Sequence, residues 1–432
     1  MVEKQLIKYI MPNTLAMVGI SCYILADTFF ISRAAGTNGI AALNLVLPFY
    51  GLIYALGAMI GVGSATRYSL LKASGSKMAD YFFSNAIIWA TFFGLILSAL
   101  GIFCPEWLLR IMGADDTIVE VGLSYTRIFM ICSPFFIVNY IFTSFVRNDN
   151  APNVAMTATI ASGLLNIAFD YILMFPLNMG MAGAALATGL SPVVSMLICM
   201  IHFLSKKNNI KFKKKMPSFK RLVSGCQLGV VAFVGEISGG ITTMAFNFIL
   251  LNLTGNIGVA AYGIVANITI VGMALLNGVA HGLQPLASAM HGEGKAEDES
   301  RIYKCSVKIA LLISAVLVAV ALVFAKDIVA IFNSENSTEL AGYAEPGMRL
   351  YFLGYLVAAV NLVKAGFYSA TGMAKEASVI SILRGVIAIV VFAFLMSMLF
   401  GITGVWLSFL VAEIFTLVYT KIFLERKKKI SI

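Results

Sequence analysis

The sequence predicts an all-α integral membrane protein whose twelve transmembrane helices form two parallel six-helix repeats around a central cavity. Three observations lead to this fold class. The 432 residues are 59% hydrophobic and only 12% charged, whereas a soluble protein has about 25% charged residues. Twelve apolar stretches reach the roughly 20 residues that a spanning helix needs, and glycine motifs of the first half return in the second. This composition excludes a soluble enzyme, because too little polar surface remains to cover a globule.

The apolar stretches give six spans in each half of the chain. In the first half we expect spans at 12–34, 42–68, 82–104, 123–146, 154–175 and 181–204. In the second half we expect spans at 224–252, 259–286, 306–325, 346–369, 378–400 and 403–424. A segment with eight basic residues, 205–221, lies between the halves. The sequence therefore predicts an N-lobe (1–204), a basic cytoplasmic linker (205–221) and a C-lobe (222–432).

Two glycine motifs recur at a nearly constant offset. The sequence GTNGIAA at 36–42 returns as GNIGVAA at 255–261, and GMAG at 180–183 returns as GITG at 401–404. Because each half has an even number of helices, both halves enter the membrane from the same side, as parallel repeats do. Paired bundles of this kind are typical of transporters that rock between two states.

The charged residues divide between alternate loops. Lys and Arg gather in one set of loops and Asp and Glu in the other, so the positive-inside rule predicts a multi-pass plasma-membrane protein with both termini in the cytoplasm. The net charge of +10 then reflects orientation and not binding to nucleic acid. The basic linker has two interpretations, a contact with anionic lipid or a solvated segment that enforces topology. The charge rule favours the second.

Motifs for catalysis or metal binding are missing from the sequence. The six cysteines form no CxxC pair, the three histidines form no HExxH motif, and there is no GxxxxGK[ST] phosphate loop. We therefore expect neither an enzyme nor a zinc protein, no organic cofactor and no direct use of ATP.

Four acidic residues lie within predicted spans, namely Asp27, Asp170, Glu236 and Glu413. None has a basic residue three or four positions away on its own helix. A charge in hydrocarbon costs about 2.5–3.5 kcal/mol on insertion scales. Each carboxylate must therefore be protonated, bind a cation or face water, which makes each one a candidate for ion coupling.

Depth in the membrane groups some of these residues. Asp27, Asp170 and Thr188 each lie about five to seven residues from the outer end of their spans, roughly 8–12 Å below the outer surface at 1.5 Å per residue. Asn166 lies one helical turn inward of Asp170 on the same face. Such oxygen-bearing groups suit Na⁺ or a shared proton. The alternative is that Asn166 and Thr188 make interhelical hydrogen bonds and Asp27 faces water.

Further polar residues are weaker candidates for contacts with substrate or ion. Glu236 lies in the glycine-rich stretch VGEISGG at 234–240, where a bend or cavity forms easily. Glu413 has the alternative of pairing with a polar group of a neighbouring helix. The amides of Asn44 and Asn139 lie within spans, and amides at that depth favour a wet central cavity over a dry bundle.

These features resemble the MATE (multidrug and toxic compound extrusion) transporters over essentially the whole chain, and most closely their DinF-like and MepA-like branches. The resemblance is carried by the repeat, by DTFFIS at 27–32 in the first span and by GTNGIAA after it. It implies that Asp27, Asn166, Asp170 and Thr188 form the cation site of the N-lobe, for H⁺ or Na⁺. It also implies that Pro12 allows helix 1 to bend.

The resemblance has one departure in the C-lobe. Glu236 falls where the NorM-like branch carries an acid on helix 7, but the helix-10 Asp of that branch has no counterpart, since span 10 contains no acid past Glu345. This difference favours ion coupling through the N-lobe.

The function implied by the resemblance is export of organic cations or amphipathic drugs in exchange for inward H⁺ or Na⁺, by alternating access.

A lipid-linked precursor flippase of the wider superfamily is the alternative. It would carry more basic cavity residues to hold a pyrophosphate, whereas only Lys364 and Arg384 approach the spans of the second half. A channel fits less well because the paired repeat and the unpaired acids favour a carrier. A membrane enzyme fits less well because the sequence has no nucleophile–base or metal-binding spacing. We expect a monomer in the lipid bilayer with small-molecule partners. The residues do not choose between H⁺ and Na⁺.

Overall fold

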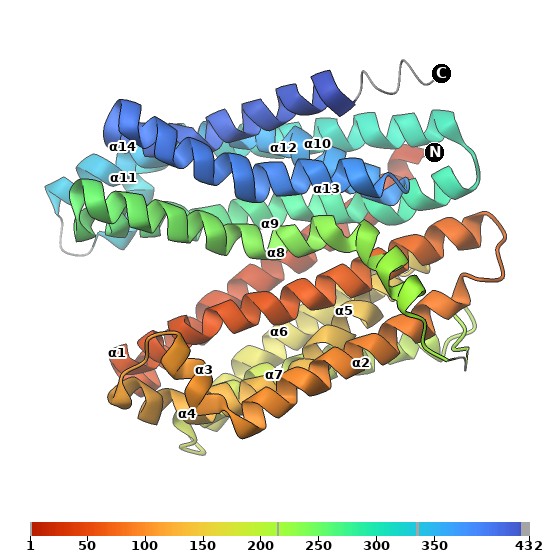
Figure 1. Cartoon of the computed structure of the whole chain (residues 1–432), viewed down its shortest axis with the longest axis horizontal. Coiled ribbons are helices and arrows are strands. Elements are labelled where there is room, and N and C mark those ends of the chain that lie inside the picture. The colour runs from red at the N-terminus through yellow and green to blue at the C-terminus, as the bar shows by residue number, and fades with distance from the viewer. Residues whose placement is uncertain (1, 214–215, 334–336, 425–432) are drawn as a thin grey trace. The chain divides into compact units, whose positions relative to one another are not determined.

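The computed structural model describes residues 2–213, 216–333 and 337–424. Within these ranges the chain forms helices joined by short loops (Figure 1). The helices of the first half are α1 Val2–Ala73, α2 Asp80–Phe103, α3 Pro105–Ile111, α4 Asp116–Ile131, α5 Ser133–Asn148, α6 Pro152–Met174 and α7 Gly180–Phe203. Those of the second half are α8 Phe219–Thr254, α9 Asn256–Gly292, α10 Ala296–Phe332, α11 Thr338–Leu353, α12 Tyr355–Ala370, α13 Ala374–Ile382, the π-helical turn η1 Leu383–Ile387, α14 Ala388–Tyr419 and the π-helical turn η2 Thr420–Leu424.

The described helices accommodate all twelve predicted spans. Among the described residues, nine helical stretches are long and apolar enough to cross a membrane, two of them within α1, and two bent helix pairs raise the number to eleven. One of the nine, Ala374–Phe423, is interrupted at Gly401, where φ is +57°. That interruption separates the last two predicted spans, so the predicted all-α fold is confirmed.

Two of the spans are bent, which the sequence did not predict. α4 meets α5 at 45° and α11 meets α12 at 42°. Pro134 lies in the first turn of α5. A helix tolerates proline there because the first N–H groups have no partner within the helix, but Pro134 cannot donate the hydrogen bond that would continue α4. Gly354 separates α11 from α12, and a Cβ on it would lie 2.5 Å from Cδ1 of Phe409. Hydropathy could not indicate these bends, because a bend does not change the hydropathy of a span.

The repeat is visible in the backbone conformation of paired glycines. Gly75 and Gly294 have φ of +75° and +72°, and Gly180 and Gly401 have φ of +51° and +57°. A positive φ is disfavoured for residues with a Cβ. The two halves therefore use glycine for the same turns at corresponding positions, as parallel repeats require.

Two compact units make up the chain. The N-terminal unit contains Leu15–Glu236 and Ser288–Gly294, and the C-terminal unit contains Met1–Thr14, Ile237–Ala287 and Lys295–Ile432. These limits fall inside α1, α8 and α9 and differ from the predicted lobe limits, which stay a prediction.

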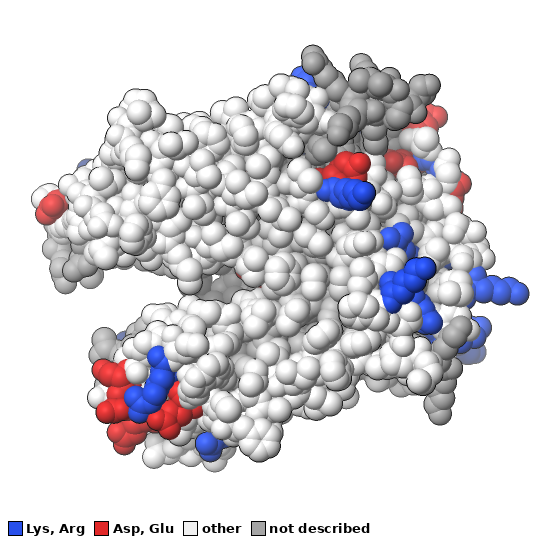
Figure 2. All heavy atoms as spheres, in the orientation of Figure 1, with Lys and Arg blue, Asp and Glu red and all other residues white. Residues whose placement is uncertain are grey.

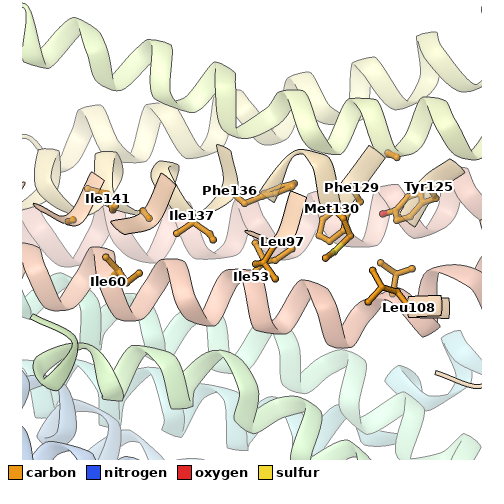
Figure 3. Packing of buried hydrophobic residues seen from close by; sticks show 14 of the residues in the cluster. Ile53, Ile60, Leu97, Leu108, Tyr125, Phe129, Met130, Phe136, Ile137 and Ile141 are labelled. Atoms are coloured by element: carbon orange, nitrogen blue, oxygen red, sulfur yellow. The ribbon is translucent and has the colours of Figure 1, made fainter. Parts of the chain in front are cut away.

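The N-terminal unit has an apolar core that runs along α1, α2, α4 and α5 (Figure 3). Ile53, Phe129 and Ile137 are fully buried in it. Helices also approach closely through glycine, since a Cβ on Gly229 of α8 would lie 1.9 Å from the carbonyl oxygen of Met59 of α1. Small residues that let backbones approach are typical of helix packing in membranes.

The helix sides are apolar and the charges lie near helix ends. Figure 2 shows Lys, Arg, Asp and Glu gathered in groups, with uncharged surface along the helices. Leu197, Ile201 and Leu312 are each more than 60% exposed, a pattern that fits side chains facing lipid. The structure thus agrees with a multi-pass membrane protein.

The described part of the basic linker is attached to the N-terminal unit. Its residue Ile210 is buried in the apolar core of that unit. The backbone N–H groups of Lys213 and Ser218 donate to Ser84 Oγ and Asn85 Oδ1 of α2, both at 2.7 Å. The linker is therefore a docked segment, although the sequence favoured a solvated one.

Candidate functional site

The first span of α1 packs beside α6 in a defined register. A Cβ on Gly163 would lie 3.0 Å from Cδ1 of Tyr23, and a Cβ on Gly19 would lie 3.4 Å from Cγ1 of Ile160. Both contacts join a residue of α1 to one 140 or 141 positions later on α6, so the helices run in the same direction. The same register places Asp27 level with residues 167–168.

The helices α6 and α7 form an antiparallel hairpin, and a Cβ on Gly183 would lie 2.9 Å from the carbonyl carbon of Leu173. Thr188 lies five residues after Gly183 on α7, and position 168 lies five residues before Leu173 on α6. Asn166 and Asp170 flank that position on one face of α6. The structure therefore brings Asp27, Asn166, Asp170 and Thr188 to one level of the N-terminal unit. Their role as an ion site stays a prediction.

These four side chains are buried, and most of their polar atoms have no hydrogen-bond partner of good geometry among the described residues. Asn166 and Asp170 are fully buried, Thr188 is 4% exposed and Asp27 is 8% exposed. Six of their polar atoms have no partner among the described residues: Asp27 Oδ1, Asn166 Nδ2 and Oδ1, Asp170 Oδ1 and Oδ2, and Thr188 Oγ1. Buried polar atoms normally have partners, and leaving one unsatisfied costs about 1–3 kcal/mol.

The unsatisfied atoms argue against a purely structural role. Thr126 of the same unit bonds the carbonyl four residues earlier, at 2.9 Å, but the Thr188 hydroxyl makes no such bond. Asn166 likewise makes no side-chain hydrogen bond to the described part of α1 or α7. The alternative in which these two residues hold helices together therefore lacks support from the structure.

The acids face each other. The carboxyl groups of Asp27 and Asp170 interact directly, and Tyr125 lies close enough to feel the charge of both. No Lys or Arg pairs with either acid among the described residues. Two adjacent carboxylates do not both stay ionised without a proton or cation between them. With an amide and a hydroxyl beside them, they form a donor set suited to H⁺ or Na⁺.

Within the described ranges, no group of three or more His, Cys, Asp or Glu side chains could hold a metal ion.

Several tyrosines lie near the site formed by Asp27, Asn166, Asp170 and Thr188. The hydroxyls of Tyr50 and Tyr125 lie 3.0 Å apart, and the Tyr50 ring stacks on Phe129 with 3.9 Å between centroids. The hydroxyls of Tyr23 and Tyr54 lie 3.5 Å apart. The sequence did not predict these tyrosines, because the members of the two pairs are 31 and 75 positions apart and form no motif within a short stretch of sequence.

Glu236 belongs to the same unit, and Tyr23 lies close enough to feel the charge of both Glu236 and Asp27. Its Oε1 accepts a hydrogen bond from the Tyr140 hydroxyl at 2.7 Å, and its side chain is exposed. Asn139, the neighbour of Tyr140 on α5, has a buried Oδ1 with no partner among the described residues. An exposed acid beside an aromatic ring is a reasonable contact for an organic cation.

Glu413 is engaged with other side chains of the C-terminal unit. Arg384 Nη2 donates to Glu413 Oε1 at 2.5 Å, and Asn361 Nδ2 donates to Glu413 Oε2 at 2.7 Å. Glu413 is 1% exposed and Arg384 is 9% exposed. This buried acid therefore has a fixed counter-charge and is a poor contact for ion or substrate. This agrees with the alternative that Glu413 pairs with a polar group of a neighbouring helix, although the sequence did not identify Arg384 as the partner.

The last two candidates are placed by the structure but not tested by it. Asn44 lies on α1 with an exposed side chain. Pro12 is buried and lies inside α1, whose helical assignment continues through it. A role of Pro12 in bending this helix stays a prediction.

Comparisons with known proteins agree with this architecture. The MatE family model matches residues 12–172 and 232–395. The chain is 28% identical over 415 residues to the multidrug export protein MepA of Staphylococcus saprophyticus subsp. saprophyticus, covering 95% of this chain and 91% of that protein.

Solved structures resemble the whole chain. One is described as the outward-facing conformation of a multidrug resistance MATE family transporter of the MOP superfamily. It superposes with a TM-score of 0.91 at 24% identity, covering 100% of this chain and 96% of that one. A crystal structure of MATE in complex with MaL6 gives a TM-score of 0.90 at 25% identity, covering 99% and 97%. These similarities show a shared fold.

Proposed function

The chain belongs to the MatE family of membrane transporters, and on this premise we propose that it is a secondary active multidrug antiporter. It exports organic cations and other amphipathic drugs in exchange for inward H⁺ or Na⁺. The relatives named as multidrug export proteins support the drug class. The antiporter mechanism is argued from the residues of the N-terminal unit.

The observation that carries the proposal is the pair of facing acids, Asp27 and Asp170, with six unsatisfied polar atoms at their level. A protein does not gain stability from such an arrangement, because each buried unsatisfied group costs free energy. Binding an ion there recovers that cost. We infer that Asp27, Asn166, Asp170 and Thr188 hold the coupling ion.

The proposed cycle uses the charge of this pair. H⁺ or Na⁺ enters from outside and neutralises the carboxylates, which weakens their attraction for a cationic drug and favours its release. When the ion leaves toward the cytoplasm, the negative charge returns and attracts the next drug cation. The ion can act in this way only if its affinity differs between the two states of the transporter.

Polar residues elsewhere have different roles in this account. Glu236, exposed and bonded to Tyr140, is proposed as a carboxylate that contacts cationic substrate. Glu413 is neutralised by Arg384, which supports coupling through the N-terminal unit alone. Because Arg384 is committed to that pair and Lys364 is also engaged, the structure offers little support for a flippase that grips a pyrophosphate.

Ethidium efflux from proteoliposomes of the purified chain tests this function. A proton gradient and a sodium gradient are imposed separately, with protein-free vesicles as the control. We expect efflux to follow one of the two gradients and to stop when a protonophore or a sodium ionophore dissipates it. Efflux under neither gradient, or equal efflux without any gradient, would contradict the proposal and favour a flippase or a channel respectively.

A further inference from the structure

A basic hollow lies at one end of the N-terminal unit, where α1 ends and α2 begins. It has a volume of about 560 Å³, and four lysines line it together with one acid: Lys72, Lys77, Lys211, Lys213 and Asp80. Its walls come from the turn between α1 and α2 and from the linker. Because both helices are candidate membrane spans, the hollow lies where the chain leaves the bilayer.

The part of the linker that lines the hollow is held in place by hydrogen bonds from its backbone N–H groups to side chains of the N-terminal unit. The N–H of Asn209 donates to Asp149 Oδ2 at 2.9 Å, and Asp149 is itself bonded to the buried His202 at 2.9 Å. The N–H of Lys213 donates to Ser84 Oγ at 2.7 Å. Lys211 and Lys213 therefore project from a backbone that is anchored on both sides, so the hollow is formed before any ligand arrives.

The charge inside the hollow is not balanced. Lys72 makes an ion pair with Asp80 at 3.6 Å and donates to the carbonyl of Asn209 at 3.0 Å. Lys77, Lys211 and Lys213 are exposed and have no ion pair with any other described residue. Four lysines against one aspartate leave a net charge of three positive units. Lysine is a common point-charge partner of phosphate.

Apolar side chains stand beside these charges. Met78 lines the hollow and is 45% exposed, and Phe212, between Lys211 and Lys213, is 55% exposed. Phe219, at the start of α8, is 63% exposed. Figure 2 shows Lys and Arg side chains gathered at this end of the unit. Basic and exposed apolar residues in alternation are typical of segments that lie on a membrane surface.

We propose that this hollow binds the phosphate headgroup of an anionic phospholipid. Lys77, Lys211 and Lys213 hold the phosphate, and Met78 and Phe212 contact the upper part of the acyl chains. Free phosphate is also an anion, but it would make no use of the apolar side chains. The position at the ends of two spans also favours a lipid.

Native mass spectrometry of the full chain in detergent, with equal amounts of dioleoyl phosphatidylglycerol and dioleoyl phosphatidylcholine, tests the proposal. We expect the natural chain to retain the anionic lipid over the neutral one by roughly tenfold. The variant Lys77→Gln/Lys211→Gln/Lys213→Gln should lose this preference. The control Lys206→Gln/Lys207→Gln/Lys220→Gln removes the same charge from exposed positions outside the hollow and should keep it.

Three results would overturn the proposal. One is equal retention of both lipids by the natural chain. Another is an equal loss of preference in the two triple variants, which would show a general charge effect. The third is full displacement of the lipid by excess inorganic phosphate, which would assign the hollow to free phosphate. Size-exclusion profiles of both variants show whether they remain folded.

Discussion

Replacing Asp170 by Asn should abolish gradient-driven ethidium efflux, reducing it to the level of protein-free vesicles. The substitution keeps the size of the side chain but removes the charge that the coupling ion must neutralise. Apart from its contact with Asp27, the Asp170 carboxyl has no hydrogen-bond partner among the described residues, and an amide can still donate to the Asp27 carboxylate, so the variant should fold normally. Efflux from proteoliposomes containing equal amounts of protein is the measurement.

The control for this experiment is Asp327→Asn, the same chemical change on an exposed residue of α10. It should leave efflux unchanged. Undiminished efflux by Asp170→Asn that still depends on the gradient would rule out this carboxylate as the coupling group. Loss of folding in Asp170→Asn, seen as aggregation, would instead show that Asp170 has a structural role.

Removing one member of the buried pair Arg384–Glu413 should produce the largest loss of stability. Glu413 is 1% exposed and Arg384 is 9% exposed, so Arg384→Met leaves an acid buried without its counter-charge. Breaking a buried ion pair in this way costs about 3–5 kcal/mol. Asn361 still donates to Glu413 at 2.7 Å, but a neutral amide does not replace a guanidinium. Chemical unfolding of the purified protein in detergent measures the change.

The double variant Arg384→Met/Glu413→Leu should recover most of the lost stability, because replacing both charges by apolar groups is often neutral. Arg110→Met is the matched control. Arg110 pairs with Glu106 and Asp116 at 2.8 Å each, but on an exposed surface, where ion pairs contribute little. Single variants as stable as the natural chain would contradict this account of the pair.

Much of the fold could be predicted because membrane helices have a strong sequence signal. About 20 apolar residues must continue without interruption to cross the bilayer, so spans such as 82–104 and 154–175 agree closely with α2 and α6. The bend between α4 and α5 could not be predicted in this way. It depends on how Pro134 packs against Gly94, where a Cβ would lie 2.5 Å from the Pro134 Cα.

The candidate site was predicted from depth along each span, which requires only the rise per residue. The structure places Asp27, Asp170 and Thr188 at one level of the N-terminal unit, as depth predicted, and their role in ion binding stays a prediction. A polar partner for Glu413 was one of the two predicted alternatives, but Arg384 was not identified as that partner, since the two residues are 29 positions apart on opposite sides of the break at Gly401. Contacts between different helices depend on rotation about the helix axis, which hydropathy does not determine.

Competition between ion and drug at the facing acids is the central claim, and equilibrium binding of ethidium to the purified protein tests it most directly. Fluorescence titrations are made at several pH values and sodium concentrations. If the coupling ion is H⁺, lowering the pH neutralises the two acids and weakens ethidium binding. If the coupling ion is Na⁺, adding Na⁺ has the same effect. We expect one of these ions to weaken binding of ethidium to the natural chain, and neither to affect Asp170→Asn. Ethidium affinity that is independent of both ions, or an ion dependence that persists in Asp170→Asn, would contradict the claim.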